Sequence, residues 1–363
     1  MEVSINEVII YVMTVFMALG AIDRIFGNRF GLGEKFEEGI LAMGSLALSM
    51  IGIIALAPVL ANVLRPVVVP LFNLVGADPA VFAGTILAND MGGAPLAKEL
   101  AQTVEAGQFG GLIVGAMLGP TVVFTIPVAL GIIKAEDRPA LARGVLAGII
   151  TIPVGSFVGG LAAGFDVLMI LRNLIPIVVI ALLIALGLFL VPNGMVKGFQ
   201  VFGKIIIIII TVGLAAAIVE TLTGITLIPG MASLEEGYLT VGGIAIVLAG
   251  AFPLVHVITK VFQKPLMKLG HLLGMNDKAA AGLVATLANN IPMFGMLHEM
   301  DGRGKVINVA FAVSAAFVFG DHLGFTAGFD ASMIFPMIVG KLVGGVTAVV
   351  VAMLITRKEA DRG

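Results

Sequence analysis

Long apolar stretches separated by short polar connections dominate this chain. A window of about 20 predominantly apolar residues is long enough to cross a bilayer as a helix. Eleven such segments can be drawn, at residues 6–26, 40–64, 79–100, 109–133, 140–164, 167–191, 200–222, 239–262, 279–300, 306–329 and 331–356. The connections are the size of ordinary loops. The pattern therefore predicts an all-α polytopic membrane protein with no domain outside the bilayer.

The third and ninth segments are interrupted at their centres. One break lies within Leu87 to Pro95 and the other within Leu287 to Pro292, and both contain Asn and Pro, with Asp and Gly in the first. Such residues free backbone groups that hydrocarbon cannot satisfy, so this backbone must face protein or a watery cavity. We expect both segments to be re-entrant, which leaves about nine true spans. Eleven crossing segments, two of them broken, are the alternative.

Composition supports the membrane class and argues against an enzyme. The chain is 59% hydrophobic and 12% charged, where soluble domains have about 45–50% and about 25%. A net charge of −2 gives no reason to expect nucleic acid as a partner. The chain lacks Cys, and it lacks the spacing of a zinc site, a nucleophile elbow or a phosphate loop. We therefore predict no catalytic activity, no metal and no cofactor.

Matches in the same order along both halves suggest an internal repeat. They pair Glu37-Glu38-Gly39 with Glu235-Glu236-Gly237, Pro58 and Pro70 with Pro253 and Pro265, Asn89 and Glu99 with Asn289 and Glu299, 119–125 with 320–326, and 154–160 with 339–345. Glycine-rich helices can look alike merely because small residues let helices pack closely. Duplication is the better interpretation, because the proline and acidic pairs are not packing residues.

The distribution of Lys and Arg decides how the copies are oriented. If the third and ninth segments turn back, the copies become inverted, and every Lys and Arg falls on one face except Arg65, Lys98, Arg172 and Lys341. By the positive-inside rule, the charge-rich face is cytoplasmic. This predicts an N-terminus outside and a C-terminus inside the bacterial cytoplasmic membrane. The predicted units are a first repeat at 1–165, a linking transmembrane helix at 166–192 and a second, inverted repeat at 193–363.

Inverted repeats with discontinuous segments place a substrate site near the bilayer midplane. Polar residues at the breaks and charges deep within spans are therefore the candidate substrate-binding residues: Asn89, Asp90, Thr125, Asn289, Asn290, Asp321, His322, Thr326 and Lys341. Several have a structural alternative, and one Asn side chain can have both roles. Lys341 can form an ion pair that neutralises Asp321, and the Asn side chains can cap half-helix ends.

At these residues the chain resembles the ethanolamine permease family (EutH), the membrane component of bacterial ethanolamine-utilisation systems. The resemblance is carried by Phe319 to Thr326, by Leu87 to Gly93 and Leu287 to Pro292, and by Asn6 to Tyr11. It implies uptake of ethanolamine across the cytoplasmic membrane to feed a cytosolic lyase. Ethanolamine is mostly protonated near neutral pH, like a lysine head group, so Asp321 and Asp90 can receive its ammonium.

Three functional hypotheses follow. The first is a carrier in which the re-entrant segments move against a scaffold, and the second is a channel-like facilitator of ethanolamine or a related small amine. The third is a non-transport intramembrane protein, which the absence of paired catalytic groups and of soluble domains disfavours. We expect membrane lipid to surround the protein. We also expect a homo-oligomer, either a dimer or a trimer.

Overall fold

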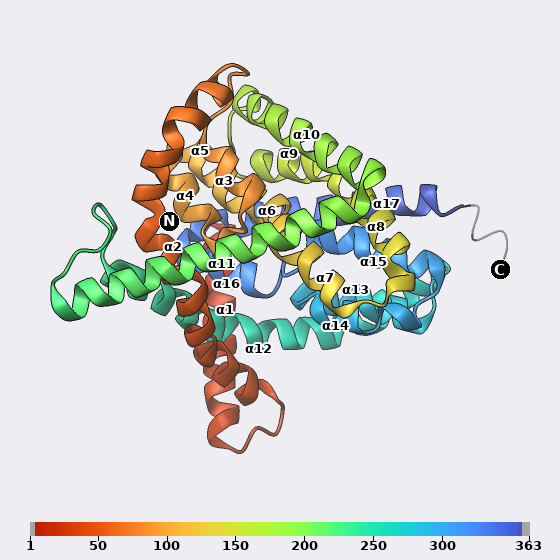
Figure 1. Cartoon of the computed structure of the whole chain (residues 1–363). Coiled ribbons are helices and arrows are strands. Elements are labelled where there is room, and N and C mark those ends of the chain that lie inside the picture. Colours follow the sequence, from red (N-terminus) through yellow and green to blue (C-terminus); the bar gives the residue numbers. More distant parts are fainter. Residues whose placement is uncertain (1–3, 358–363) are drawn as a thin grey trace.

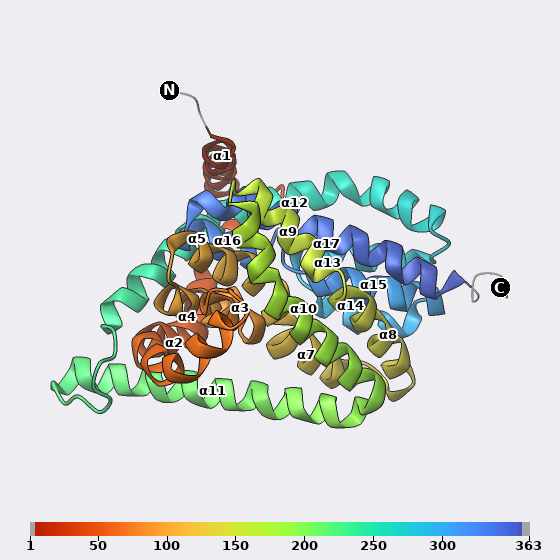
Figure 2. The same ribbon diagram turned by 90° about the horizontal axis from the view of Figure 1, so that it is seen from above.

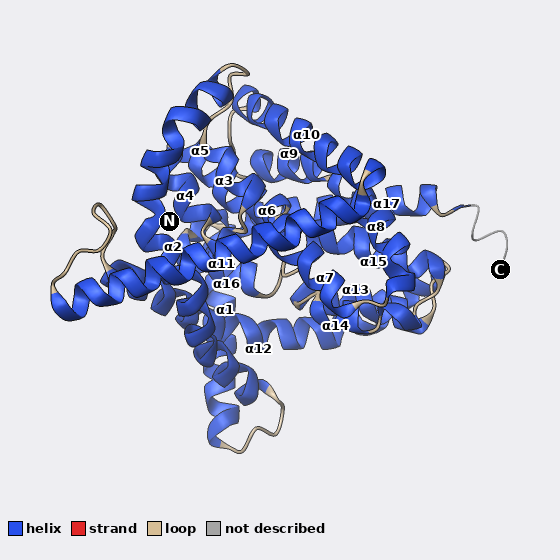
Figure 3. Cartoon of the chain, viewed as in Figure 1, coloured by secondary structure: helices blue, strands red, loops and turns tan. Residues whose placement is uncertain are grey.

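The computed structural model describes residues 4–357, and all regular structure in this range is helical (Figure 3). Eight helical runs within it are long and apolar enough to cross a membrane: Ile5–Ile25, Leu32–Asn73, Val104–Ile132, Ala135–Ala162, Val167–Leu190, Lys197–Thr223, Leu234–Leu272 and Ala331–Ile355. The predicted all-α polytopic membrane class is confirmed. Lys358 and Arg362, which the charge argument placed on the cytoplasmic face, lie outside the described residues.

Long helices form the frame of the molecule. Helix α2 (Leu32–Asn73) packs along α12 (Leu234–Leu272), and both contact α1 (Ile5–Ile25). Helix α11 (Pro192–Thr223) crosses α2, and in Figure 2 α11 and α12 run along opposite sides of the molecule. The α2–α11 crossing depends on Gly52, where a Cβ atom would lie 1.9 Å from the carbonyl oxygen of Ile210. The two backbones therefore touch.

The outer helices carry apolar side chains on the surface. Helix α10 (Val167–Leu190) exposes Leu182, Leu183 and Phe189, and α11 exposes Ile207 and Ile208. Contiguous exposed apolar surface of this kind is unfavourable in water and suits hydrocarbon. Helices α10 and α11 lie on the outside of the fold (Figure 1), and we expect these apolar faces to contact lipid.

The third predicted segment folds back on itself. It consists of α3 (Ala80–Ile86), the short turn η1 (Asn89–Met91) and α4 (Gly93–Leu100), and α3 and α4 pack against each other. Its two ends meet, because the Asp78 carboxylate accepts a hydrogen bond from the backbone N–H of Gln102 at 3.0 Å. A segment that crossed a bilayer would separate these residues by about 30 Å. This segment is therefore a helical hairpin, hairpin 1.

The ninth predicted segment is hairpin 2. It contains α13 (Asp277–Ala288), α14 (Ile291–Gly295) and the turn η6 (Leu297–Glu299). Its ends also meet: the Asn276 backbone N–H donates to Asp301 at 2.8 Å, and the Asn276 side chain donates to the carbonyl of Glu299 at 3.0 Å. Hairpin 1 packs against α2 and hairpin 2 against α12.

The structure differs from the predicted number of about nine spans at 306–329. The chain there is divided into α15 (Gly302–Ala315) and α16 (Asp321–Phe329), so the structure has eight continuous candidates within residues 4–357. Its counterpart in the predicted repeat is also irregular. That run passes through α5 (Val104–Gln108), the π-helical η2 (Phe109–Ile113), η3 (Val114–Ala116), α6 (Leu118–Pro120), the π-helical η4 (Thr121–Thr125) and α7 (Ile126–Ile132). The apolar pattern continues across both interruptions and hides them.

The remaining helices complete the body. The turn η5 (Ala135–Asp137) leads into α8 (Arg138–Ile149) and α9 (Ile152–Ala162), and η7 (Ala331–Met333) leads into α17 (Ile334–Ile355). Helices α9 and α17 pack through glycines, since a Cβ atom on Gly155 would lie 2.5 Å from the Gly340 carbonyl oxygen. These two segments were matched in the sequence repeat. The repeat itself and its unit boundaries stay predictions.

The hairpins predict a labelling pattern. Cysteines introduced at exposed Val75 and Val104 flank hairpin 1 and should react with an impermeant thiol reagent from the same side of the membrane. A cysteine at exposed Leu272, before hairpin 2, should react from the other side if the repeats are inverted. The chain has no native Cys, so each label reports one position. Labelling of positions 75 and 104 from different sides would contradict the hairpin.

Candidate functional site

The break in hairpin 1 brings an unpartnered amide into the centre of the protein. Asn89 is fully buried, and neither its amide oxygen nor its amide nitrogen has a hydrogen-bond partner. The break packs on the irregular run behind it, because a Cβ atom on Gly119 would lie 1.9 Å from the Leu87 carbonyl oxygen. Leaving buried amide groups unpaired costs about 1–3 kcal/mol each. Two such atoms at one break make Asn89 suited to receive a polar ligand.

Three titratable side chains, those of Lys341, His322 and Asp90, lie in a row beside this break. The Lys341 ammonium donates to the Ala116 carbonyl oxygen in a short contact, and its Nζ lies 3.0 Å from Nδ1 of His322. Nε2 of His322 lies 3.9 Å from Oδ1 of Asp90. A charged lysine can only donate, so when Lys341 is charged we assign Nδ1 of His322 as the acceptor and place the ring proton on Nε2, facing Asp90.

Asp321 is the first residue of α16 and directly precedes His322. Helix α16 packs against η1, which carries Asp90. Within residues 4–357 the Asp321 carboxylate has no hydrogen bond and no ion pair, and its electrostatic neighbours include Asp90 and Glu38. The sequence offered an ion pair between Lys341 and Asp321 as the structural alternative. Among the described residues this ion pair does not form, and Lys341 contacts His322 instead. The Asp321 carboxylate is thus available to a cation.

The break in hairpin 2 lies in a second polar group. The Asn290 amide donates to the Thr125 hydroxyl at 3.1 Å, and the Asn290 amide oxygen is buried and unpartnered. Asn289 is only half-buried, and its side chain accepts a hydrogen bond from the Ile291 backbone N–H at 2.8 Å. The Asn289 side chain therefore holds the first backbone N–H of the following half-helix, α14 (Ile291–Gly295), whose N-cap is Asn290.

Phe317 joins the two groups and was not foreseen from the sequence. Its ring centroid lies 5.2 Å from that of His322 and 5.5 Å from that of Phe124, the neighbour of Thr125. Its φ is 63°, in the left-handed region, which costs a bulky residue of order 1–3 kcal/mol. The Phe317 backbone N–H donates to the Thr286 carbonyl at 3.2 Å. A strained aromatic at the interruption of a span is typical of a functional position, but a lone Phe gives no signal in the sequence.

The nine predicted residues thus fall into four sets. Five share the neighbourhood of the hairpin 1 break: Asn89, Asp90, Asp321, His322 and Lys341. Asn290 and Thr125 form the second group, while Asn289 bonds to the backbone at the start of α14. Thr326 lies farther along α16, fully buried, with an unpartnered hydroxyl. A polar interior that holds two carboxylates and several unpaired polar atoms can bind a small cation that also carries hydrogen-bonding groups.

The similarity to known proteins extends over nearly the whole chain. The family model described as "Ethanolamine utilisation protein, EutH" matches residues 5–355. The chain belongs to this family. It is 67% identical to a protein of Listeria monocytogenes, over 98% of this chain and 95% of that protein, and 53% identical to one of Escherichia coli, over 98% and 97%. Both are named "Probable ethanolamine permease EutH". No solved structure matches significantly.

In this EutH family member, a pocket of about 580 Å³ opens at the ends of hairpin 1. Hairpin 1, α2, the start of α12 and the end of α16 line it, and none of the nine predicted residues does. It contains the carboxylates of Glu99, Glu236 and Asp330 and one ammonium, that of Lys98. Its wall at Gly328 lies two residues beyond Thr326. We call this pocket the vestibule; its acidic lining attracts cations.

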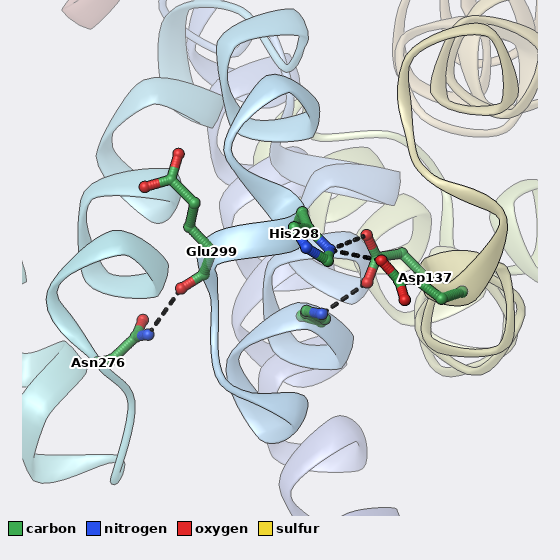
Figure 4. Close-up of polar contacts among 6 residues, drawn as sticks. Asp137, Asn276, His298 and Glu299 are labelled. Carbon is green, nitrogen blue, oxygen red and sulfur yellow. Dashed lines mark hydrogen bonds and ion pairs between the residues drawn. The ribbon is translucent and has the colours of Figure 1, made fainter.

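A second polar cluster ties hairpin 2 to the start of α8 (Figure 4). The buried Asp137 carboxylate lies 2.5 Å from the Lys305 ammonium and 3.3 Å from Nδ1 of His298, which belongs to the hairpin. At the exposed end of the hairpin, Lys278 pairs with Glu299 at 2.8 Å, and this contact holds the pKa of the Glu299 carboxyl below its usual range. We call the Asp137–His298–Lys305 contact the clasp.

Loss of the clasp should loosen hairpin 2. Asp137→Asn leaves the mostly buried Lys305 ammonium without its carboxylate, which should cost about 1–3 kcal/mol. We expect a lower melting temperature of the purified protein and faster proteolysis within residues 296–301. Glu136→Gln is the control, because Glu136 is exposed and its one ion pair within residues 4–357 is that with His298, at 3.3 Å. Equal stability of the two variants would contradict a holding role for Asp137.

Proposed function

We propose that this protein is a permease that takes up ethanolamine across the bacterial cytoplasmic membrane, and that it is a transporter and not an enzyme. The observation that supports this most strongly is whole-chain identity of 53–67% to proteins named as probable ethanolamine permeases. The buried centre adds a chemical argument, since it holds the groups that this substrate needs within a fold of membrane-spanning helices.

The substrate has a primary ammonium with three donors and a hydroxyl that both donates and accepts. In our proposal Asp321 and Asp90 receive the ammonium by charge-assisted hydrogen bonds. The unpartnered amide of Asn89 and the hydroxyl of Thr326 are available to the substrate hydroxyl. Asn290 and Thr125 bond to each other and form the far wall. Lys341 and His322 set the charge of the site and do not contact the ammonium.

A carrier is favoured over a channel-like facilitator because most of the central side chains are enclosed and Asp90 and Asp321 are only partly exposed. Asn89, Asn290 and Thr326 are fully buried, and His322 and Lys341 are almost so. The vestibule approaches them from the side of the hairpin 1 ends, where Lys98 and Arg65 lie. We predicted that side to be external. Movement of the hairpins would then expose the site alternately to each face.

Counterflow of labelled ethanolamine into proteoliposomes preloaded with unlabelled ethanolamine tests this proposal. A carrier gives transient accumulation of label and a saturable rate, both absent from protein-free liposomes. A linear rate without accumulation would instead identify a channel-like facilitator. Absence of any protein-dependent flux would contradict the proposed function.

Orientation and assembly belong to the same proposal. The N-terminus is placed outside and the C-terminus in the cytoplasm, and a dimer or trimer is expected. Cysteines at Phe30 and Leu227, both well exposed in equivalent loops, should be labelled from opposite faces, with position 227 reactive from outside intact cells. Position 230 is less suitable, because Gly230 has a φ of 85° that a cysteine would strain. Labelling of both positions from one face would contradict the inverted arrangement.

A further inference from the structure

The charges at the centre do not cancel. Asp90 and Asp321 supply two carboxylates, and Lys341 supplies one ammonium. His322 stays neutral when it accepts from Lys341, as argued above. The groups that face this cluster from other elements are Glu38 of α2, whose carboxylate is an electrostatic neighbour of Asp321, and Lys35, which pairs with Glu38. The Lys35–Glu38 pair is neutral, so the central cluster has a net charge of −1 when both carboxylates are ionised and Lys341 is charged.

A net charge inside the low-dielectric part of a membrane protein is costly. The site reaches neutrality in two ways: a proton on one of the two carboxylates, or a monovalent cation beside them. These two states exclude each other, because both together would give the site a charge of +1. The geometry therefore couples the substrate to a proton.

We propose that the protein exchanges one protonated amine for one proton across the membrane. This inference rests on the proposed function and adds its coupling. On the outer side, an arriving ammonium displaces the proton: the carboxylic O–H bond breaks, and the proton passes to external water. On the inner side, the ammonium leaves and a cytosolic proton forms the O–H bond again. The site then returns empty and neutral.

His322 and Lys341 have defined parts in this exchange. Lys341 is the fixed positive charge that offsets one carboxylate, and the Ala116 carbonyl helps to hold it in place. His322, between Lys341 and Asp90, directs its Nε2 proton to Asp90 and stabilises that carboxylate when it is ionised. The net result of a cycle equals the inward movement of the neutral amine. Uptake is then electroneutral and does not respond to the membrane potential.

Charge movement by the wild-type protein tests the inference. Proteoliposomes on a supported membrane receive ethanolamine at an acidic pH, where little neutral amine exists to leak through lipid. We expect labelled uptake with internal alkalinisation, both above the level of protein-free liposomes, and no inward current. Uptake with an inward current that grows with an inside-negative potential would overturn the exchange and leave the permease proposal intact. No protein-dependent uptake would contradict both.

A charge-rescue pair assigns the coupling to these residues. Asp90→Asn makes the empty site neutral without a proton, so ammonium binding would leave it at +1 and uptake should be lost. The double variant Asp90→Asn/Lys341→Met restores a fixed charge of −1 through Asp321 alone. We expect it to transport several-fold faster than Asp90→Asn, again without current. If the folded double variant is as inactive as the single one, the assignment to these residues is wrong.

Discussion

Asp321→Asn is expected to reduce ethanolamine uptake by roughly 10- to 100-fold while leaving the amount of folded protein unchanged. A hydrogen bond to a charged group is worth about 1.5–3 kcal/mol, and the substitution removes the charge while keeping the size of the side chain. Structural loss should be small, because within the described residues no hydrogen bond or ion pair holds the Asp321 carboxylate. Initial rates of labelled uptake at equal protein per liposome measure the effect.

The chain offers a matched control. Asp277 is also the first residue of a helix, α13, and its side chain is 79% exposed. Asp277→Asn should therefore transport at the wild-type rate, which separates a binding role from any general effect of Asp at a helix start. Wild-type uptake by Asp321→Asn would remove this carboxylate from the site. Loss of folded protein in that variant would show that Asp321 is structural.

The helical hairpins could be predicted because polar residues interrupt an apolar pattern there. Asn89 and Asn289 mark the two breaks. Backbone groups freed at a break find no hydrogen-bond partner in hydrocarbon, so the backbone there must face the protein interior. The same reasoning could not find the interruption at residues 316–320. The residues there are mainly Ala, Phe and Val, which suit a helix in lipid, and the break becomes visible only in the left-handed backbone of Phe317.

The candidate site was partly predictable for a similar reason. A charge in the middle of a span is costly wherever it points, so Asp321, His322 and Lys341 could be singled out without knowing the fold. Their pairing could not be predicted, because it depends on how α16 and α17 are rotated. The sequence suggested that Lys341 pairs with Asp321, whereas in the structure it contacts His322 at 3.0 Å. The role of Asn289 could not be predicted either, since an Asn at a helix break can bond to the backbone or to a ligand, and in the structure its side chain bonds to the backbone of Ile291.

Two glycines at matched positions of the predicted repeat let each hairpin break approach the interrupted helix that follows it. A Cβ atom on Gly119 would lie 1.9 Å from the Leu87 carbonyl oxygen, and one on Gly320 would lie 2.1 Å from that of Ala288. These backbone carbonyl groups cannot move aside for an added methyl group as the end of a flexible side chain can. We therefore expect Gly119→Ala and Gly320→Ala each to destabilise the protein by at least about 1–3 kcal/mol and to abolish uptake, because the breaks carry the central residues.

Gly243→Ala in α12 is the control, since no atom beyond its neighbours and its own helix backbone lies within 4 Å of the added Cβ. There the methyl group should raise stability by up to about 1 kcal/mol, because Ala favours a helix more than Gly does. The same substitution is thus expected to act in opposite directions, as measured by the melting temperature of the purified protein. If Gly119→Ala and Gly320→Ala keep wild-type stability and uptake, the hairpin breaks are not held by these backbone contacts, and the central residues are positioned in some other way.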